Sequence, residues 1–497
     1  MRQGCRVAIA IALAGCLAPC GCEEIEAASE ARPLNIVVIT IDTLRADHLH
    51  CYGYPRQTTP RIDAIAERGL VFEQAAAQWP KTGPSMSSLL SSTYGSTSGV
   101  ARSTMKEKIP LSYELLPELL KGAGYSTFGV VSNMSLTSTF QFDQGFDQLK
   151  VAGGKPANAI SAAARDLVEK RDPTRPYFLW VHYLDPHAPY KPPQGHGSEY
   201  KEFIGDELFE SDQRAPVPVD PRVADPVAAT AVDGNEVGMI PAYAYLQGKE
   251  RIRDYVAQYD GDIRFLDEHV GVLVDWLEQS GNLSHTILVV TADHGESLGD
   301  HNYFFEHGRF PYDDCVRVPL ILLHPDGKPG RISSPVGLID VAPTLLEMVG
   351  VAPGPQFEGR SLLGWLAEGA PESGAHPVFT ESGYLKQFEV SIRKGRWKLI
   401  KIGSKYVAKM LQNVPYELYD LLDDPGETKN LVDERSEVFE ELRPLLDARV
   451  ELAYASVPPS VDGALALSPE EQAFQKALGY GNDKERAEYG DGRGGGD

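Results

Sequence analysis

Residues 36–42 read Ile-Val-Val-Ile-Thr-Ile-Asp, a run of β-branched residues that ends at an aspartate. Two further runs have this form: residues 177–183, soon followed by Asp185, and residues 287–291, soon followed by Asp293. Continuous apolar strands are typical of a sheet that is covered on both faces. Because the carboxyl ends of such strands meet at one edge, we expect the three aspartates to converge on a charged site.

The stretches between these strands have helical character, for example near residues 113–122 and 263–279. Strands that alternate with helices indicate an α/β fold. Residues 376–450 contain shorter strand-like runs followed by a helix. We therefore predict a large mixed, mainly parallel sheet between helices, with a small C-terminal α+β subdomain.

The charge balance limits the class of partner. The chain has 497 residues, with 47 Lys and Arg against 70 Asp and Glu, which gives a net charge of −23. A nucleic-acid backbone requires a basic face, so the sequence argues against nucleic acid as a partner. The 42% hydrophobic content is ordinary for a folded protein.

The N-terminus has the pattern of an export signal. Residues 1–15 start with Arg2 and Arg6, which precede a short apolar run at residues 7–14. This run is shorter than the ~20 residues that span a bilayer. The end of this run, Leu-Ala-Gly-Cys16, resembles the lipobox of bacterial lipoproteins. The resemblance implies a lipid on Cys16, which would anchor the exported chain to a bacterial membrane at the periplasm or cell surface. The alternative is ordinary signal cleavage near Gly15.

Changes in composition suggest the remaining boundaries. Residues 16–33 are small and polar, as in a tether, and residues 34–375 would form the main domain. Residues 190–245, rich in Pro, Asp and Gly, are expected to form a surface insertion. Residues 376–450 would form the C-terminal subdomain, and we expect the polar residues 451–497 to be a flexible tail. Since only Cys51 and Cys315 lie in the body, the chain is no disulfide scaffold.

The predicted cluster of aspartates needs a counter-charge, because carboxylates at one strand edge repel one another. Oxygen ligands suit Ca²⁺, Mg²⁺ or Mn²⁺, and an added histidine moves the preference toward Mn²⁺ or Zn²⁺. Asp293 and His294 follow a strand directly and supply one oxygen and one nitrogen ligand.

A threonine near a predicted helix start is the candidate nucleophile. Residues 82–86 read Thr-Gly-Pro-Ser-Met, and Pro84 suits the first helical position. Thr82 would then lie just before the helix, where backbone N–H groups favour an anion, and a nearby metal would activate its hydroxyl. The alternative is that Thr82 only caps the helix. His187 and His307 lie in turn-rich segments, where a single histidine also has a structural interpretation.

Ordered motifs along residues 33–445 resemble the sulfatase family of the alkaline-phosphatase-like superfamily. The motifs that carry the resemblance are residues 39–47, 51–54, 59–63, 185–190, 291–299, 317–321, 340–346 and 417–431. The resemblance implies that Asp42, Asp293 and His294 are metal ligands and that Thr82 occupies the nucleophile position. It also implies that His187 and His307 contact the anionic group of the substrate or assist the leaving group.

The departures from the family pattern concern the nucleophile and its surroundings. Standard sulfatases convert a Cys or Ser to formylglycine, whereas oxidation of the secondary alcohol of Thr82 would give a ketone. Met86 replaces the motif's Arg, Thr43 replaces the second Asp of a pair, and His307 stands in place of a Lys. The set of Asp42, Thr82, Asp293 and His294 resembles that of relatives with a threonine nucleophile, which include phosphoethanolamine transferases, lipoteichoic-acid synthases and nucleotide phosphodiesterases.

The sequence therefore predicts a metal-dependent hydrolase that cleaves sulfuric or phosphoric esters through Thr82, with an anionic ester as its substrate. One alternative is a phosphodiesterase or phosphoryl transferase with the same nucleophile. The other is an inactive lipoprotein that binds a ligand. A set of basic residues in the C-terminal part favours either a solvated strand edge or an anionic substrate: Arg393, Lys394, Arg396 and Lys398.

Overall fold

A computed structural model describes most of the chain between residues 33 and 477. The described ranges are 33–101, 107–193, 230–232, 235–237, 240–241, 243–246, 252–368, 376–384, 387–403, 415–456 and 467–477. The signal, Cys16 and the tether before Pro33 lie outside the described residues, as do most of the predicted insertion and of the predicted tail. Every described helix and strand belongs to one unit, Leu34–Asp497.

The central element is a nine-stranded sheet within the described residues, with the order β12-β2-β11-β8-β1-β5-β3-β4 and β13 beside β2. Its strands are β1 Asn35–Ile41, β2 Leu70–Ala76, β3 Ser126–Val131, β4 Gln148–Val151, β5 Tyr177–Tyr183, β8 Thr286–Ala292, β11 Arg317–Leu323, β12 Gly330–Ile332 and β13 Val336–Gly337. Strands β8, β1, β5, β3 and β4 run parallel, whereas β11 is antiparallel to β8 and β2.

The three strands predicted from apolar runs, β1, β5 and β8, lie side by side in the middle of this sheet. Every residue in them is buried. Full burial on both faces explains why they lack the alternation of apolar and polar residues that a half-exposed strand shows. The register pairs Thr40 of β1 with His182 of β5 and with Thr291 of β8.

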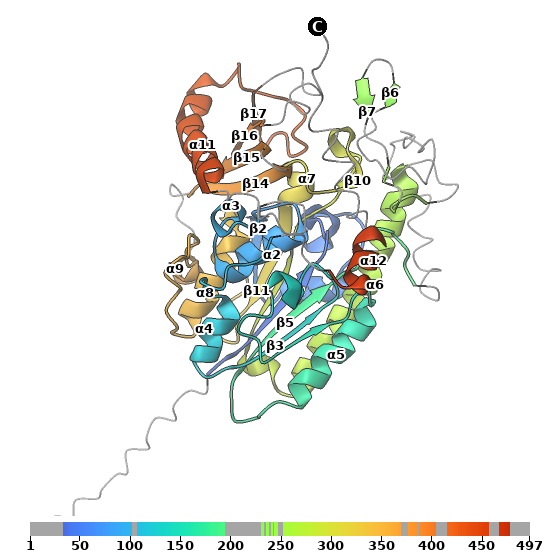
Figure 1. Ribbon diagram of the computed structural model, residues 1–497, viewed down its shortest axis with the longest axis vertical. Helices are drawn as coiled ribbons and strands as arrows, with labels where there is room; N and C mark the ends of the chain where they lie inside the picture. Colours follow the sequence, from blue (N-terminus) through green and yellow to red (C-terminus); the bar gives the residue numbers. More distant parts are fainter. Residues whose placement is uncertain are drawn as a thin grey trace, which may run out of the picture. The chain divides into compact units, whose positions relative to one another are not determined.

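Helices cover both faces of the sheet (Figure 1). Helices α5 and α6 pack together against one face, with α1 beside α6, and α2, α4 and α8 pack together on the other. Their bounds are α1 Pro60–Ala66, α2 Thr82–Ser91, α4 Leu116–Gly122, α5 Ala157–Glu169, α6 Ile252–Gln279 and α8 Val341–Met348, and shorter α-helices are α3 Gly95–Ser98, α7 Asp313–Val316 and α9 Leu363–Glu368. The predicted α/β fold, with a mixed sheet between helices, is confirmed.

A second, antiparallel sheet follows in the C-terminal part, with the order β14-β15-β16-β17. Its strands are β14 Val378–Tyr384, β15 Gln387–Lys394, β16 Trp397–Lys401 and β17 Tyr416–Asp420. Helix α11, Ser436–Ser456, packs on β15 and β16, and a separate apolar cluster fills this contact. The remaining elements are α12 Pro469–Ala477 and the two-stranded pairs β9 Ser297–Leu298 with β10 Phe304–Glu306 and β6 Thr230–Val232 with β7 Asn235–Val237.

Two basic residues of the C-terminal sheet are buried in ion pairs. Lys398 is 1% exposed, and its Nζ lies 2.7 Å from Asp313 Oδ1 and 2.8 Å from Glu427 Oε1. Arg393, 6% exposed, contacts the other oxygen of Asp313 at 3.0 Å. The strand-edge interpretation is therefore wrong for both residues, because they cross to α7 instead of facing solvent. The other two pair with acidic residues nearer the surface: Lys394 with Glu441, and Arg396 with Asp420 and Asp423.

Cys51 and Cys315 are both free thiols, as expected for a chain without a disulfide scaffold. In the part of the chain that the structure describes, no helix combines the length and the apolar character needed to cross a membrane.

Candidate active site

Four neighbouring parallel strands deliver polar side chains to one edge of the sheet. Asp42 directly follows β1, and Asp293 directly follows β8. Asn133 lies just beyond β3, and His182 is the penultimate residue of β5. All four side chains are completely buried. The convergence expected for Asp42 and Asp293 is therefore observed, with two residues from the adjacent strands added to it.

Thr82 is the first residue of α2, with Lys81 in the N-cap position. We expected this helix to start at Pro84, and it starts two residues earlier. Pro84 fits inside the first turn because the backbone N–H groups there make no hydrogen bond within the helix. Thr82 is 2% exposed. Its Oγ1 lies 3.4 Å from His294 Nε2 and accepts a hydrogen bond from Asn133 Nδ2 at 3.3 Å. The hydroxyl thus faces the same site as the aspartates.

Each of the two carboxylates is held through only one of its oxygens. Asp42 Oδ2 accepts a hydrogen bond from Asn133 Nδ2 at 2.7 Å. Asp293 Oδ1 accepts the backbone N–H groups of Thr43 at 3.1 Å and His294 at 2.7 Å. The other oxygens, Asp42 Oδ1 and Asp293 Oδ2, are buried and have no hydrogen-bond partner among the described residues.

The two unpartnered oxygens face one imidazole. His294 Nε2 lies 3.8 Å from Asp42 Oδ1 and 3.5 Å from Asp293 Oδ2. Two ligand atoms at about 2.1 Å from one tetrahedral zinc ion lie about 3.4 Å apart. Burying carboxylate oxygens without partners is costly, and a bound cation removes that cost. These residues therefore fit a divalent metal ion.

The electrostatics of the two carboxylates also indicate a missing counter-charge. Burial alone would raise the pKa of Asp42, but the neighbouring imidazoles, His187 above all, lower it to about 2. Burial, together with the charge of Asp42, holds the pKa of Asp293 well above its usual range. A divalent cation would allow both carboxylates to ionise at neutral pH.

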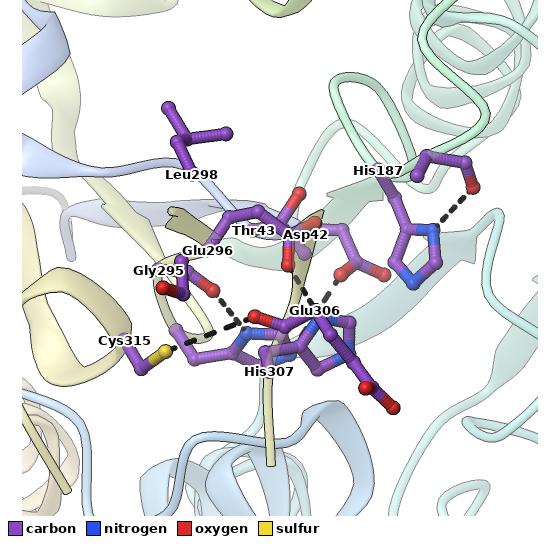
Figure 2. Close-up of polar contacts among 12 residues, drawn as sticks. Asp42, Thr43, His187, Gly295, Glu296, Leu298, Glu306, His307 and Cys315 are labelled. Carbon is purple, nitrogen blue, oxygen red and sulfur yellow. Dashed lines mark hydrogen bonds and ion pairs between the residues drawn. The ribbon is translucent and has the colours of Figure 1, made fainter. Parts of the chain in front are cut away.

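Two further histidines reach the site from loops. His187 lies in the loop after β5 and His307 directly follows β10. The ring centroids of these two histidines are 5.2 Å apart, and that of His307 is 4.3 Å from that of His294. Figure 2 shows Asp42, His187 and His307 gathered around one site from different elements. Burial lowers the pKa of His187 and, helped by the charge of His294, that of His307.

A buried glutamate orients His307. His307 Nδ1 lies 3.0 Å from Glu296 Oε1, and the Tyr190 hydroxyl donates to Glu296 Oε2 at 3.1 Å. Glu296 has no exposed surface, and burial raises its pKa well above the usual value. This contact on Nδ1 directs the opposite nitrogen of the ring away from Glu296.

Lys81 brings a positive charge to the histidines. Its side chain is buried, with 6% exposure. After burial itself, the charge of Lys81 is among the causes that lower the pKa of His187, His294 and His307. The family pattern contains an Arg and a Lys that this chain replaces with Met86 and His307. Lys81, directly before Thr82, supplies a positive charge near these positions.

Asp185 is directed to a helix instead of the site. Its Oδ2 accepts a hydrogen bond at 2.9 Å from the backbone N–H of Ala157, the first residue of α5. The expected convergence of three aspartates is therefore wrong for Asp185, because the N–H groups at a helix start attract a carboxylate. Strand β5 contributes His182 to the site in its place.

Two substituted positions of the family pattern have different surroundings. Met86 is completely buried in the main apolar core. Thr43 adopts a left-handed conformation, with φ of 57°, which costs about 1–3 kcal/mol for a residue of this kind. Its carbonyl accepts the Tyr259 hydroxyl at 2.6 Å and its N–H donates to Asp293. The strained turn places Asp42 and Asp293 next to each other.

Sequence reasoning missed three residues of the site: Asn133, His182 and Lys81. Two of them carried a usable signal. His182 is a polar residue inside an otherwise apolar buried run, which is the informative exception in such a strand. Asn133 follows a strand end in the same way as Asp42. The position of Lys81 depends on where α2 begins, and the sequence left that start two residues in error.

The fold is that of an alkaline-phosphatase-like hydrolase. It has a mixed sheet between helices, carboxylates and histidines at the ends of the parallel strands, and a hydroxyl at the start of a helix. The family model described as sulfatase matches residues 34–351, and the model described as N-sulphoglucosamine sulphohydrolase, C-terminal, matches residues 299–452. The chain belongs to the sulfatase family and is a hydrolase of the sulfuric ester type.

Individual relatives agree with this assignment. The chain is 24% identical to an N-acetylglucosamine-6-O-sulfatase of Bacteroides thetaiotaomicron, over 85% of each protein. Its fold is similar to that of BT4656 in complex with its substrate D-glucosamine-2-N,6-O-disulfate, with a TM-score of 0.68, 22% identity, and coverage of 87% of this chain and 100% of that one. A phosphonate monoester hydrolase of Agrobacterium radiobacter is also similar, with a TM-score of 0.64, 19% identity, and coverage of 85% and 96%.

Proposed function

We propose that the chain is a metal-dependent hydrolase that cleaves sulfuric or phosphoric esters with Thr82 as its nucleophile. The observation that carries this proposal is the position of Thr82 Oγ1, buried in the first turn of α2 and 3.4 Å from His294 Nε2. The two half-partnered carboxylates, Asp42 and Asp293, face the same imidazole.

Asp42, Asp293 and His294 would hold the divalent metal. Such a cation, when bound, lowers the pKa of a nearby hydroxyl and draws charge from the ester oxygen. Asn133 donates to both Asp42 and Thr82, so one amide positions a carboxylate and the nucleophile together.

In the proposed reaction, Thr82 Oγ1 gives its proton to the neutral imidazole of His187 or His307 and attacks the sulfur or phosphorus opposite the leaving oxygen. The new Oγ1 bond forms as the bond to the leaving oxygen breaks, and the protonated imidazole gives that oxygen the proton. Both imidazoles are held in the neutral form by burial, and the charge of a bound anion would favour their protonation. Water then cleaves the threonyl ester and restores Thr82.

Sulfate and phosphate esters are both compatible with this site. Support for a sulfated substrate comes from family membership and from the disulfated sugar that is the substrate of BT4656. Support for a phosphoryl substrate comes from Thr82 itself, since a threonine cannot become the aldehyde of formylglycine. The phosphonate monoester hydrolase neighbour has the same fold. Phosphodiester cleavage or phosphoryl transfer is therefore the second candidate.

We also propose that residues 34–375 form the catalytic domain and residues 376–450 its C-terminal subdomain. A lipid on Cys16 would anchor the exported protein to a bacterial membrane, at the periplasm or cell surface. The support for the anchor is the lipobox-like sequence at residues 13–16.

Metal removal tests the proposed function. The full-length protein, stripped with a chelator, is expected to lose turnover of aryl sulfate, aryl phosphate or bis-aryl phosphate and to regain it with one of Ca²⁺, Mg²⁺, Mn²⁺ or Zn²⁺. The ester with the highest kcat/KM identifies the substrate class. Turnover that persists without metal contradicts the metal requirement, and no turnover of any ester with any metal favours a ligand-binding lipoprotein.

A second prediction concerns Lys81. Lys81→Met removes the buried charge that lies among the histidines, and we expect kcat/KM to fall by about 10- to 100-fold, as for a lost charge-assisted hydrogen bond. Lys81→Arg, which keeps the charge, should retain more activity. Lys121→Met is a matched control, because Lys121 is half exposed and pairs with Asp147. Equal losses in Lys81→Met and Lys121→Met would contradict a role for the Lys81 charge in turnover.

A further inference from the structure

His182 is a buried imidazole that the proposed reaction does not use. It lies on β5 between strands β1 and β3, with no exposed surface. Its Nε2 has no hydrogen-bond partner among the described residues. The nitrogen lies 3.6 Å from Asp42 Oδ2, which is beyond hydrogen-bond distance, and that oxygen already accepts a bond from Asn133.

The unpartnered nitrogen belongs to a group of three. Ligand atoms of Asp42, His182 and Asp293 all lie within 4.8 Å of one another. Each of these side chains has a buried atom without a hydrogen-bond partner: Asp42 Oδ1, Asp293 Oδ2 and His182 Nε2. A cation held by one atom from each residue would give His182 Nε2 a partner and would neutralise both carboxylates.

The opposite side of the ring is arranged as in a metal-binding histidine. Trp180 Nε1 can only donate, and it does so to Thr40 Oγ1 at 2.9 Å. His182 Nδ1 lies 2.8 Å from the same oxygen, and the Thr40 hydroxyl has Val181 O as an acceptor at 3.4 Å. When the Thr40 hydroxyl donates to Val181 O, His182 Nδ1 donates to Thr40, and this arrangement leaves a lone pair on Nε2. Such an outer hydrogen bond fixes the tautomer and ring orientation of a ligating histidine.

From these contacts we infer that His182 is a ligand of the catalytic metal and that the site selects a transition metal such as Zn²⁺ or Mn²⁺ over Ca²⁺. The inference rests on the proposed function, since the metal is the one proposed there. His182 adds an imidazole nitrogen to the two carboxylates of the group. Ca²⁺ and Mg²⁺ take oxygen ligands, whereas imidazole suits zinc and the neighbouring first-row metals.

Metal binding to the full-length apo-protein tests the inference without any turnover. In calorimetric titrations we expect Zn²⁺ or Mn²⁺ to bind at least 100-fold more tightly than Ca²⁺. His182→Gln should weaken Zn²⁺ binding by about 100-fold, and Thr40→Val, which removes the outer hydrogen bond, by about 10-fold. The visible spectrum of bound Co²⁺ should change in His182→Gln, because a nitrogen ligand is lost.

His48→Gln is the matched control. His48 is also buried, and its Nδ1 lies 2.8 Å from Asp260 Oδ1, so its loss disturbs a buried pair at another place. This variant should keep the wild-type metal affinity. A wild-type Zn²⁺ affinity and Co²⁺ spectrum in His182→Gln would overturn the inference while leaving the proposed function intact, provided that Asp293→Asn abolishes binding. Tighter binding of Ca²⁺ than of Zn²⁺ and Mn²⁺ would overturn it too. Failure of the wild type to bind any divalent cation would overturn both proposals.

Discussion

Thr82→Ala is expected to lower kcat by about 10⁴-fold or more, because it removes the attacking oxygen. The change deletes one buried hydroxyl, which accepts a hydrogen bond from Asn133 and lies 3.4 Å from His294 Nε2. Asp42, Asp293 and His294 keep their other contacts, so metal binding and thermal stability should change little. Steady-state kinetics on the preferred aryl ester, with the metal-induced shift in Tm as a second readout, measure both effects.

Thr82→Ser is the matched variant for this test, since it keeps the hydroxyl and loses one methyl group. We expect its kcat to remain within about tenfold of the wild type, the loss coming from a less firmly held oxygen. Rapid quenching of the wild type should also trap a sulfuryl or phosphoryl group on the peptide that contains residue 82. Unchanged turnover in Thr82→Ala, or a modified peptide elsewhere, would show that another group is the nucleophile.

Lys398→Met is expected to destabilise the protein by about 3–5 kcal/mol, the range for breaking a buried ion pair by removing one partner. Lys398 has 1% exposure and lies between Asp313 and Glu427, both buried. Without the ammonium group, Asp313 would keep its ion pair with Arg393, and the Glu427 carboxylate would lose its ion pair with Lys398. The free energy of unfolding, from urea denaturation followed by fluorescence, measures the effect.

The position of this ion pair adds a second expected consequence. Asp313 begins α7, and the carbonyl of Cys315 in that helix accepts the Gly295 N–H at 2.8 Å, next to His294. A loosened α7 should therefore also reduce activity at temperatures below unfolding. Lys401→Met is the control on the same strand, because Lys401 pairs with Asp447 at 2.7 Å with both side chains about 30% exposed. We expect it to cost less than about 1 kcal/mol. Equal losses in the two variants would contradict a special role for the buried pair.

Much of the fold was predictable because the decisive signals are local. The apolar runs that form β1, β5 and β8 are continuous, and continuous runs require cover on both faces of a sheet. The aspartates that follow β1 and β8 meet for the same reason, since parallel neighbours end at one edge. The ordered motifs also predicted the sulfatase family. The family model that matches residues 34–351 confirms this prediction.

The candidate site was only partly predictable. Asp42 and Asp293 were placed together correctly, whereas Asp185, which resembles them in sequence, binds the start of α5. Asp185 binds α5 because the N-terminus of that helix lies beside its loop. The sequence alone does not show which helix lies there. Likewise Arg393 and Lys398 alternate with apolar residues as on an exposed strand, yet α7 covers them and supplies their counter-charge.

The fold class, the family and the aspartates at the central strand ends could be read from the sequence, because burial pattern and motif order are properties of the chain. The folding of the chain brought Asn133 to Asp42 and Thr82, and His182 to Asp42, because those contacts depend on strand order. Strand order is set by the packing of the whole sheet, through contacts between residues that are far apart in the chain. The grouping of Asp42, His182 and Asp293 is therefore a property of the folded molecule.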